Sequence, residues 1–346
     1  MNDNFNDNFQ DPLGAASDGA PDGESVEGSP EGGAERELGH LPVMVDEVVE
    51  TLAPRADSLQ IDATLGGAGH AERILEACDP DGRLLGLDAD GAAIARARRR
   101  LARFGDRAVL RQANFRDLAQ VAPEAGFGAV DGMLLDLGLS SYQLGDVERG
   151  FGFRAGGRLD MRFDTSRGRS AADLLATMDA ADLTALFRKY GEEPFSGRIS
   201  RAIVETRVRT PIETAEQLAA LVERAVPAPR ARRTHPATRV FQALRIAVND
   251  ELGALEAGLA AALVLLRPGG RLVVLSYHSL EDRIVKRFIA TEQRGCVCPP
   301  EVPICVCGRR PRLRSLGKSR PPTAAEIQAN PRSRSARLRG AERVAA

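Results

Sequence analysis

The chain has 346 residues and 43% of them are hydrophobic, so it can form one large domain or two ordinary ones. No apolar run is long enough to cross a membrane and the acidic N-terminus lacks a secretory pattern, so we expect a cytoplasmic protein with no membrane partner. The net charge of −1 conceals an acidic N-terminal end and an arginine-rich C-terminal end. A basic end favours a polyanion such as RNA as partner, although a solvated tail has the same composition.

Residues 1–38 are rich in Asn, Asp, Gly, Ser, Glu and Pro, with few large apolar side chains. Such a segment buries too little surface to offset its chain entropy, so a disordered acidic extension is predicted. The first ordered element is expected in "HLPVMVDEVVETL", residues 40–52, where valines recur at helical spacing.

Strand and helix patterns then alternate. Strands are predicted at 59–64, 83–90, 108–115 and 129–141, and helices at 70–78 and 91–104. Near-continuous apolar strands indicate a parallel sheet that is covered on both faces. The fold class expected is therefore α/β, with a mostly parallel, doubly wound sheet.

The alternation breaks after about residue 145, and residues 170–226 show only helix patterns, with Ser170 as an N-cap. It resumes with a long helix at 238–266, with a break expected near Gly253, then a strand within 267–279 and a helix at 280–293. The organisation expected is a disordered extension (1–38), a discontinuous α/β domain (39–145 and 236–293), a helical insert for substrate recognition (146–235) and a basic Cys-, Pro- and Arg-rich segment (294–346).

The stretch "IDATLGGAGHAERIL", residues 61–75, places three glycines between a predicted strand and a predicted helix. Glycine lets the backbone pass close to a ligand, and the first amides of a helix attract negative charge. Asp88 ends the next predicted strand, where an acid commonly accepts hydrogen bonds from ribose. The turn and the acid together predict a ligand of the adenosine type, either S-adenosylmethionine or NAD.

Two features favour S-adenosylmethionine. The glycine spacing is not the G-x-G-x-x-G that suits a pyrophosphate. Asp62 and Asp136 are expected at strand ends beside the turn, giving a negative mouth that suits a sulfonium and an ammonium and repels a pyrophosphate. Asp136 alone could equally be a helix cap or a salt-bridge partner.

Four of the five cysteines gather in "CVCPPEVPICVC" as Cys296, Cys298, Cys305 and Cys307. Two C-x-C pairs can place four thiolates around one zinc ion. The familiar zinc sites use C-x-x-C instead, so plain reduced thiols in a loop are the alternative. The isolated Cys78 is expected to be a buried thiol.

Longer motifs carry a family resemblance across residues 40–340. They include "DATLGGAGH", "LLDLGLSSYQLGDVERGFGFRAGGRLDMRFD", "HPATRVFQALRIAVNDEL" and "SYHSLEDRIVKRF". These stretches resemble the bacterial RsmH (MraW) family of S-adenosylmethionine-dependent methyltransferases, which act on the N4 of cytidine 1402 in the 16S rRNA of the small ribosomal subunit. The resemblance implies a class I methyltransferase fold of Rossmann-like type with a helical insert, S-adenosylmethionine as cofactor, and rRNA as partner.

The resemblance also implies a set of cofactor contacts. The residues that match the family pattern are Ala68, Gly69 and His70 on the turn, Asp88 for the ribose, Phe115 against the adenine, and Asp136 and Gln143. The family usually has glycine where Ala68 stands. From its sequence context alone, Phe115 is more typical of a core residue, and His70 of the surface at the start of a helix.

Two loops at strand ends could face the substrate. Their candidate residues are Ser140 and Ser141 in one loop, and His278, Glu281 and Asp282 in the other. Ser279 is equally a plausible N-cap, with Asp282 as its partner. Candidate RNA-backbone contacts are Arg154, Arg158, Arg162, Arg167, Arg169, Arg332, Arg334, Arg337 and Arg339. No residue is singled out as general base, and an NAD-dependent oxidoreductase or a non-catalytic RNA-binding assembly factor are the alternative functions.

Overall fold

The computed structural model describes residues 42–152, 157–227, 235–294, 296, 298–299, 304 and 307–345. The predicted disordered extension, Arg154 and Cys305 lie outside the described residues.

Seven strands of the described chain form one sheet in the order β3-β2-β1-β4-β5-β7-β6. The strands are β1 (Leu59–Asp62), β2 (Arg83–Asp88), β3 (Ala108–Gln112), β4 (Val130–Asp136), β5 (Leu266–Ser276), β6 (Leu313–Ser315) and β7 (Arg337–Arg343). β1 to β5 pair in parallel, whereas β7 runs antiparallel to both β5 and β6. The order reverses between β1 and β4, and a ligand cleft is expected outside the carboxyl ends of the strands at such a point.

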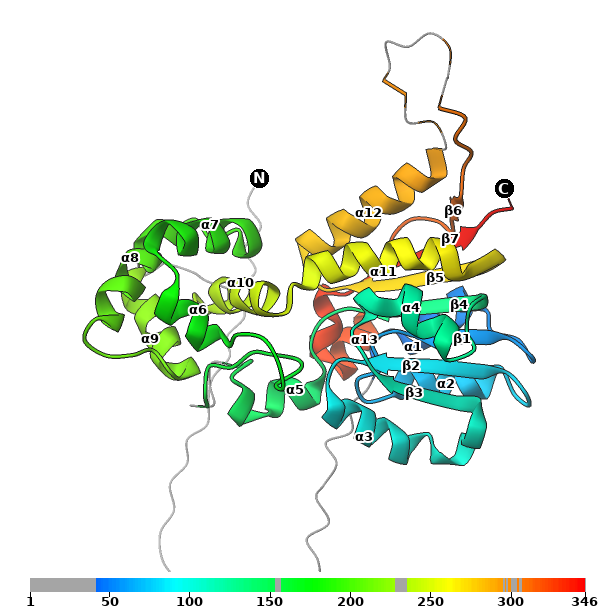
Figure 1. Cartoon of the computed structure of the whole chain (residues 1–346), viewed down its shortest axis with the longest axis horizontal. Helices are drawn as coiled ribbons and strands as arrows, with labels where there is room; N and C mark the ends of the chain where they lie inside the picture. The colour runs from blue at the N-terminus through cyan, green and yellow to red at the C-terminus, as the bar shows by residue number, and fades with distance from the viewer. Residues whose placement is uncertain are drawn as a thin grey trace, which may run out of the picture. The chain divides into compact units, whose positions relative to one another are not determined.

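Both faces of the sheet are buried (Figure 1). One face packs against α1 (Val45–Leu52), α2 (Gly69–Ala77) and α3 (Gly91–Arg100), and the other against α4 (Leu118–Glu124), α11 (Glu251–Leu265) and α12 (Ser279–Arg294). Within β4, Met133 and Leu135 face the side covered by α4, α11 and α12, while Leu134 faces the side covered by α1, α2 and α3. This alternation of two buried sides explains the continuous apolar runs in the sequence.

A second core belongs to the helices between β4 and α11 (Figure 1). They are α5 (Ser141–Gly145), α6 (Ala171–Thr177), α7 (Ala180–Gly191), α8 (Ser196–Arg207), α9 (Ala215–Ala225) and α10 (Thr238–Asn249). The predicted N-cap at Ser170 is confirmed, because its side chain accepts from the Asp173 amide in a capping box. Asn249 ties this layer to the loop before α6, since it accepts from the Phe163 amide at 2.7 Å and donates to the Met161 carbonyl at 2.7 Å.

The long helix predicted at 238–266 is broken, as expected, into two helices. The break lies at Asp250, just before the predicted Gly253, and Asp250 separates α10 from α11 with a left-handed backbone (φ 47, ψ 48). The sequence offers no glycine or proline at Asp250, which is why the pattern pointed to Gly253.

Several elements went unpredicted. α4 contains Pro123, which reads as a helix breaker. β6, β7 and α13 (Ala324–Ala329) lie in the arginine- and proline-rich segment where no pattern was recognised. The strand predicted to 115 ends at Gln112, and Phe115 begins a short 3-10 helix, η2 (Phe115–Asp117). The other 3-10 helices are η1 (Ala102–Arg107), η3 (Val147–Arg149) and η4 (Pro331–Ser335).

Candidate active site

A cavity of about 410 Å³ opens at the carboxyl ends of the central strands. Its volume lies in the range of small-molecule sites. Of the predicted cofactor contacts, it is lined by Gly69, His70, Asp88, Phe115, Asp136 and Gln143. Ala68 is not part of the lining, because its side chain is fully buried in the core under α2.

The glycine turn leads directly into α2. Gly66 and Ala68 both have positive φ, 49° and 59°, so the turn is tight. Ala68 is the N-cap of α2 and its side chain caps nothing, whereas Asp90 caps α3 by accepting from the Ala92 amide. The first turn of α2 therefore presents amide dipoles to the cavity that suit a ligand carboxylate.

Asp88 is fixed by two backbone amides. Its Oδ2 accepts from Gly66 N at 2.8 Å and its Oδ1 accepts from Asp90 N at 2.8 Å. Burial raises the pKa of Asp88 to about 6, and the two amide bonds oppose that rise. Each carboxylate oxygen keeps a second lone pair, so the group can also accept from ribose hydroxyls.

Phe115 forms an apolar wall on the same side as Asp88. It packs on α11, where a Cβ added at Gly258 would lie only 2.9 Å from Phe115 Cδ2. Ala254 and Leu255 of α11 continue the apolar lining. A wall of this kind suits the face of a purine, and Gly258 is what lets the ring lie close to the helix.

Asp136 and His70 meet at the other end of the cavity. Asp136 Oδ1 accepts from the hydroxyl of Tyr277 at 2.8 Å, and its Oδ2 is 3.5 Å from His70 Nδ1. His70 Nε2 lies 2.9 Å from the Val43 carbonyl, so Nε2 carries a hydrogen and donates. Burial raises the pKa of Asp136 to about 7 and lowers the pKa of His70.

The other acid predicted at the mouth, Asp62, lies beneath it. Asp62 is only 1% exposed and is not part of the cavity lining, so the prediction of a mouth flanked by two carboxylates needs correction. Burial raises its pKa to about 7, with the nearby Asp136 and Asp88 adding to the rise. Its oxygen accepts from the Thr64 amide at 3.2 Å. A buried cation in the cavity would favour the charged forms of these acids.

The residues predicted to face the substrate divide into two groups. Ser140, Ser141 and Glu281 line the cavity, whereas His278 and Asp282 do not. Ser140 and Gln143 form the capping box of α5, with Ser140 N donating to Gln143 Oε1 at 3.0 Å.

The start of α12 differs from the predicted cap. His278, rather than Ser279, accepts from an amide of the first turn, because its Nδ1 lies 3.4 Å from Glu281 N. In return, Glu281 Oε2 accepts from Tyr277 N at 2.8 Å and from His278 N at 3.3 Å. Ser279 instead donates its hydroxyl hydrogen to Glu192. Asp282 pairs with Arg339 of β7 through both oxygens, at 2.7 and 3.0 Å, which is a bidentate structural contact.

Glu281 belongs to a buried polar cluster that the sequence did not reveal. Its Oε1 lies 3.1 Å from His278 Nε2, and Arg245 Nε lies 2.8 Å from Glu251 Oε1. Hydrogen bonding and charge from His278 and Arg245 keep the pKa of Glu281 low despite the opposing effect of burial, whereas burial raises the pKa of Glu251. The only available signal was a lone arginine among apolar residues in "FQALRIAV".

Among the predicted RNA-contacting arginines, Arg332 lines the cavity. Arg162 and Arg167 pair with Asp160 and Asp164. Of the predicted arginines that the structure describes, Arg332 alone lines the cavity. Contact between these arginines and RNA stays a prediction.

The identity of the cofactor follows from the chemistry of the cavity. It offers helix amides for a carboxylate, acids for cationic groups, a ribose acceptor and an apolar wall for a purine. These residues fit S-adenosylmethionine, and Asp136 would oppose a pyrophosphate. The sheet order, with its antiparallel β7, and this site define a class I S-adenosylmethionine-dependent methyltransferase.

Comparisons with known proteins agree with that class. The profile of the MraW methylase family matches residues 37–344, and the chain belongs to this family. It is 57% identical over 308 residues to the ribosomal RNA small subunit methyltransferase H of Thermomicrobium roseum, covering 88% of this chain and 94% of that one. The enzyme of the same name from Geotalea uraniireducens is 52% identical over 307 residues, covering 88% and 98%.

A solved structure, the N-methyltransferase NodS from Bradyrhizobium japonicum, aligns with a TM-score of 0.38 at 10% identity, covering 87% of this chain and 94% of that chain.

Across the described residues, no helix has the length and apolar character needed to span a membrane.

Proposed function

We propose that this chain methylates the exocyclic N4 of a cytidine, position 1402, in the 16S rRNA of the small ribosomal subunit, with S-adenosylmethionine as methyl donor. The observation that carries the proposal is that one cavity joins the cofactor wall to a buried cluster of acids and arginine. The names of the relatives, which specify small-subunit ribosomal RNA, support the substrate.

The buried cluster matches the edge of cytosine. Cytosine offers amine hydrogens at N4 and acceptors at its ring nitrogen and carbonyl. Glu281 and Glu251 can accept from the amine, and Arg245 can donate to the acceptors. A base must leave its stack to reach this cavity, and such enzymes recognise it by its hydrogen-bonding edge. Arg332 at the lining supplies positive charge for the adjoining backbone.

The chain's groups then manage orientation and the proton. When bound, S-adenosylmethionine supplies an electrophilic methyl group on a positively charged sulfur. The N4 lone pair of cytosine is conjugated with the ring, so a carboxylate that accepts from the amine makes it a better nucleophile. Asp136 lines the cavity, and its charged form, which a bound sulfonium favours, can accept the departing amine proton. Tyr277 holds that carboxylate through its 2.8 Å hydrogen bond.

The test is methyl transfer by the full chain to small ribosomal subunits from a strain that lacks this modification. Nucleoside mass spectrometry should show N4-methylcytidine, and mapping by fragment mass should place it at position 1402. Asp88→Asn should lower cofactor affinity, and naked 16S rRNA compared with the subunit shows which form is used. Methylation at another atom, or none with either substrate while S-adenosylmethionine binds, would refute the proposal.

A further inference from the structure

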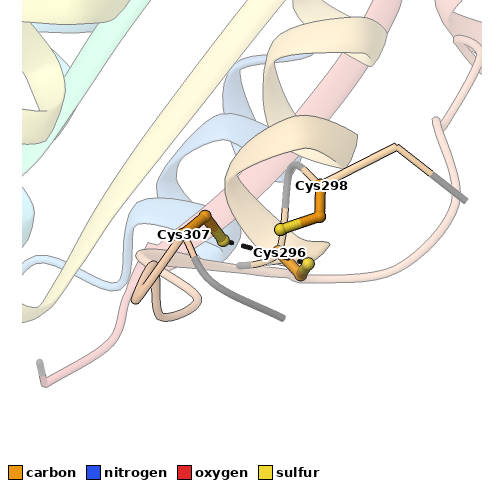
Figure 2. A group of neighbouring side chains, drawn as sticks. All are labelled: Cys296, Cys298 and Cys307. Carbon is orange, nitrogen blue, oxygen red and sulfur yellow. Dashed lines mark hydrogen bonds between the residues drawn. The ribbon is translucent and has the colours of Figure 1, made fainter. Parts of the chain in front are cut away.

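Three cysteine side chains converge where the chain leaves α12 and returns toward β6. Cys296 follows the end of α12 by two residues, and Cys307 precedes β6 by six. Figure 2 shows the sulfurs of Cys296, Cys298 and Cys307 directed toward one another beside the end of the helix. The three Sγ atoms all lie within 4.8 Å of one another. The proposed methyl transfer makes no use of this group, which lies outside the cavity lining.

The sulfur spacing matches a metal site better than a disulfide. The Sγ atoms of Cys307 and Cys296 are 3.9 Å apart, nearly twice a disulfide bond of about 2.05 Å. In a tetrahedral zinc site with Zn–S bonds of about 2.3 Å, neighbouring sulfurs are separated by about 3.8 Å. Little movement of this pair would be needed to bring both sulfurs to a common zinc ion.

The two arms that carry Cys296 and Cys307 are held together without any metal. The Glu292 carbonyl, in the last turn of α12, accepts from Arg312 N at 2.8 Å, just before β6. The Glu292 carboxylate pairs with both Arg309 and Arg312. Glu292 is only 5% exposed, whereas the side chains of Arg309 and Arg312 are 24% and 42% exposed. Beyond these contacts, Gly308 turns the chain with φ 61° immediately after Cys307.

The cysteine group is accessible to a metal ion from solvent. Cys296 and Cys307 are exposed and Cys298 is half-buried, so a metal ion can reach the group from solvent. Soft sulfur ligands select zinc over magnesium or calcium.

We propose that Cys296, Cys298 and Cys307 bind one zinc ion, which fixes the segment between α12 and β6. Each coordinating thiol releases one proton, and no redox change is involved. The three sulfurs leave one tetrahedral position for a further donor.

The test measures metal on the full-length protein, purified under reducing conditions without a histidine tag. The chain is loaded with zinc, freed of loose metal by gel filtration, and assayed by elemental mass spectrometry. About one zinc per chain is expected. Substituted cobalt should give the sulfur-to-metal charge-transfer absorption and the intense visible bands of a tetrahedral thiolate site.

The decisive variants are Cys296→Ser and Cys307→Ser. Each should weaken zinc binding by more than about 100-fold, since even the loss of an outer-shell partner costs 10–100-fold. Cys78→Ala is the matched control. Cys78 is also a cysteine, but it is buried in the core beside α2 and does not belong to the group of three. This variant should keep its zinc. Calorimetry with S-adenosylmethionine checks the fold of every variant.

Two results would overturn the proposal. One is a wild-type chain that binds S-adenosylmethionine yet retains no zinc and gives no cobalt charge-transfer band. The other is zinc retained equally by wild type and by the two serine variants, which would place the metal elsewhere.

Discussion

The buried acids of the cavity make cofactor affinity depend on pH in a definite direction. Burial raises the pKa of Asp136 to about 7, so in the ligand-free protein this carboxyl is mainly protonated below that pH and charged above it. A sulfonium favours the charged form. The affinity for S-adenosylmethionine should therefore be greatest above about pH 7 and should decline as the pH falls through that value.

The magnitude follows from the protonated fraction. If the cation binds only the charged carboxylate, the affinity at about pH 6 is roughly tenfold lower than at about pH 8, equivalent to about 1.4 kcal/mol. Near pH 7, binding of the cation should release about half a proton from Asp136. Asp62 has a similar pKa and should release a similar amount if the cation also favours its charged form. Titration calorimetry in buffers of different ionisation enthalpy counts those protons.

The demethylated product, S-adenosylhomocysteine, is the matched ligand because it lacks the sulfonium charge and keeps the other groups. The sulfonium lowers the pKa of the amine in its own ligand, so each affinity is first corrected for the protonated fraction of the free ligand and the ratio is then taken. That ratio should shift toward S-adenosylmethionine as the pH rises, and Asp136→Asn should remove most of the shift. A ratio that stays constant between about pH 6 and about pH 8 in the wild-type chain would show that these acids do not recognise the sulfonium.

The remaining predictions concern single contacts. Tyr277→Phe removes a hydrogen bond that lowers the pKa of Asp136, so the midpoint of the pH-dependent affinity should rise by about one unit; an unchanged midpoint would contradict the 2.8 Å contact. Gly258→Ala should displace the Phe115 ring and weaken both adenosine ligands by about tenfold at an unchanged melting temperature, whereas Gly145→Ala, whose added Cβ meets nothing, should not alter affinity. Glu292→Gln should lower the urea concentration at the midpoint of unfolding, because Arg309 and Arg312 lose a charged partner at the end of α12.

The sheet was predictable where burial on both faces imposes a pattern. β1, β2 and β4 are mostly apolar and each ends in an acid, and those ends lie at one edge of a parallel sheet. Asp88 and Asp136 were therefore found from spacing alone. Phenylalanine is common in protein cores, and histidine is common on the surface at the start of a helix. Only the family resemblance therefore singled out Phe115 and His70.

The unpredicted parts depend on pairing between distant segments. β7 is only partly buried along its length, so its sequence shows no strand period, and it forms because β5 offers an open edge. Tyr277 follows β5 and binds Asp136, which ends β4, a contact created by the register of the two strands. No local motif encodes such a contact.

The break at Asp250 explains how a helical insert and a sheet share one cavity. Arg245 lies in α10, with the insert, and Glu251 begins α11, which packs on the sheet, so their 2.8 Å ion pair spans the break. Arg116, adjacent to Phe115, donates to the Asp250 carbonyl at 3.1 Å and also pairs with the Asp250 carboxylate. A continuous helix would carry Glu251 round the axis away from this position. The left-handed residue thus places the proposed base-binding cluster beside the proposed adenine wall.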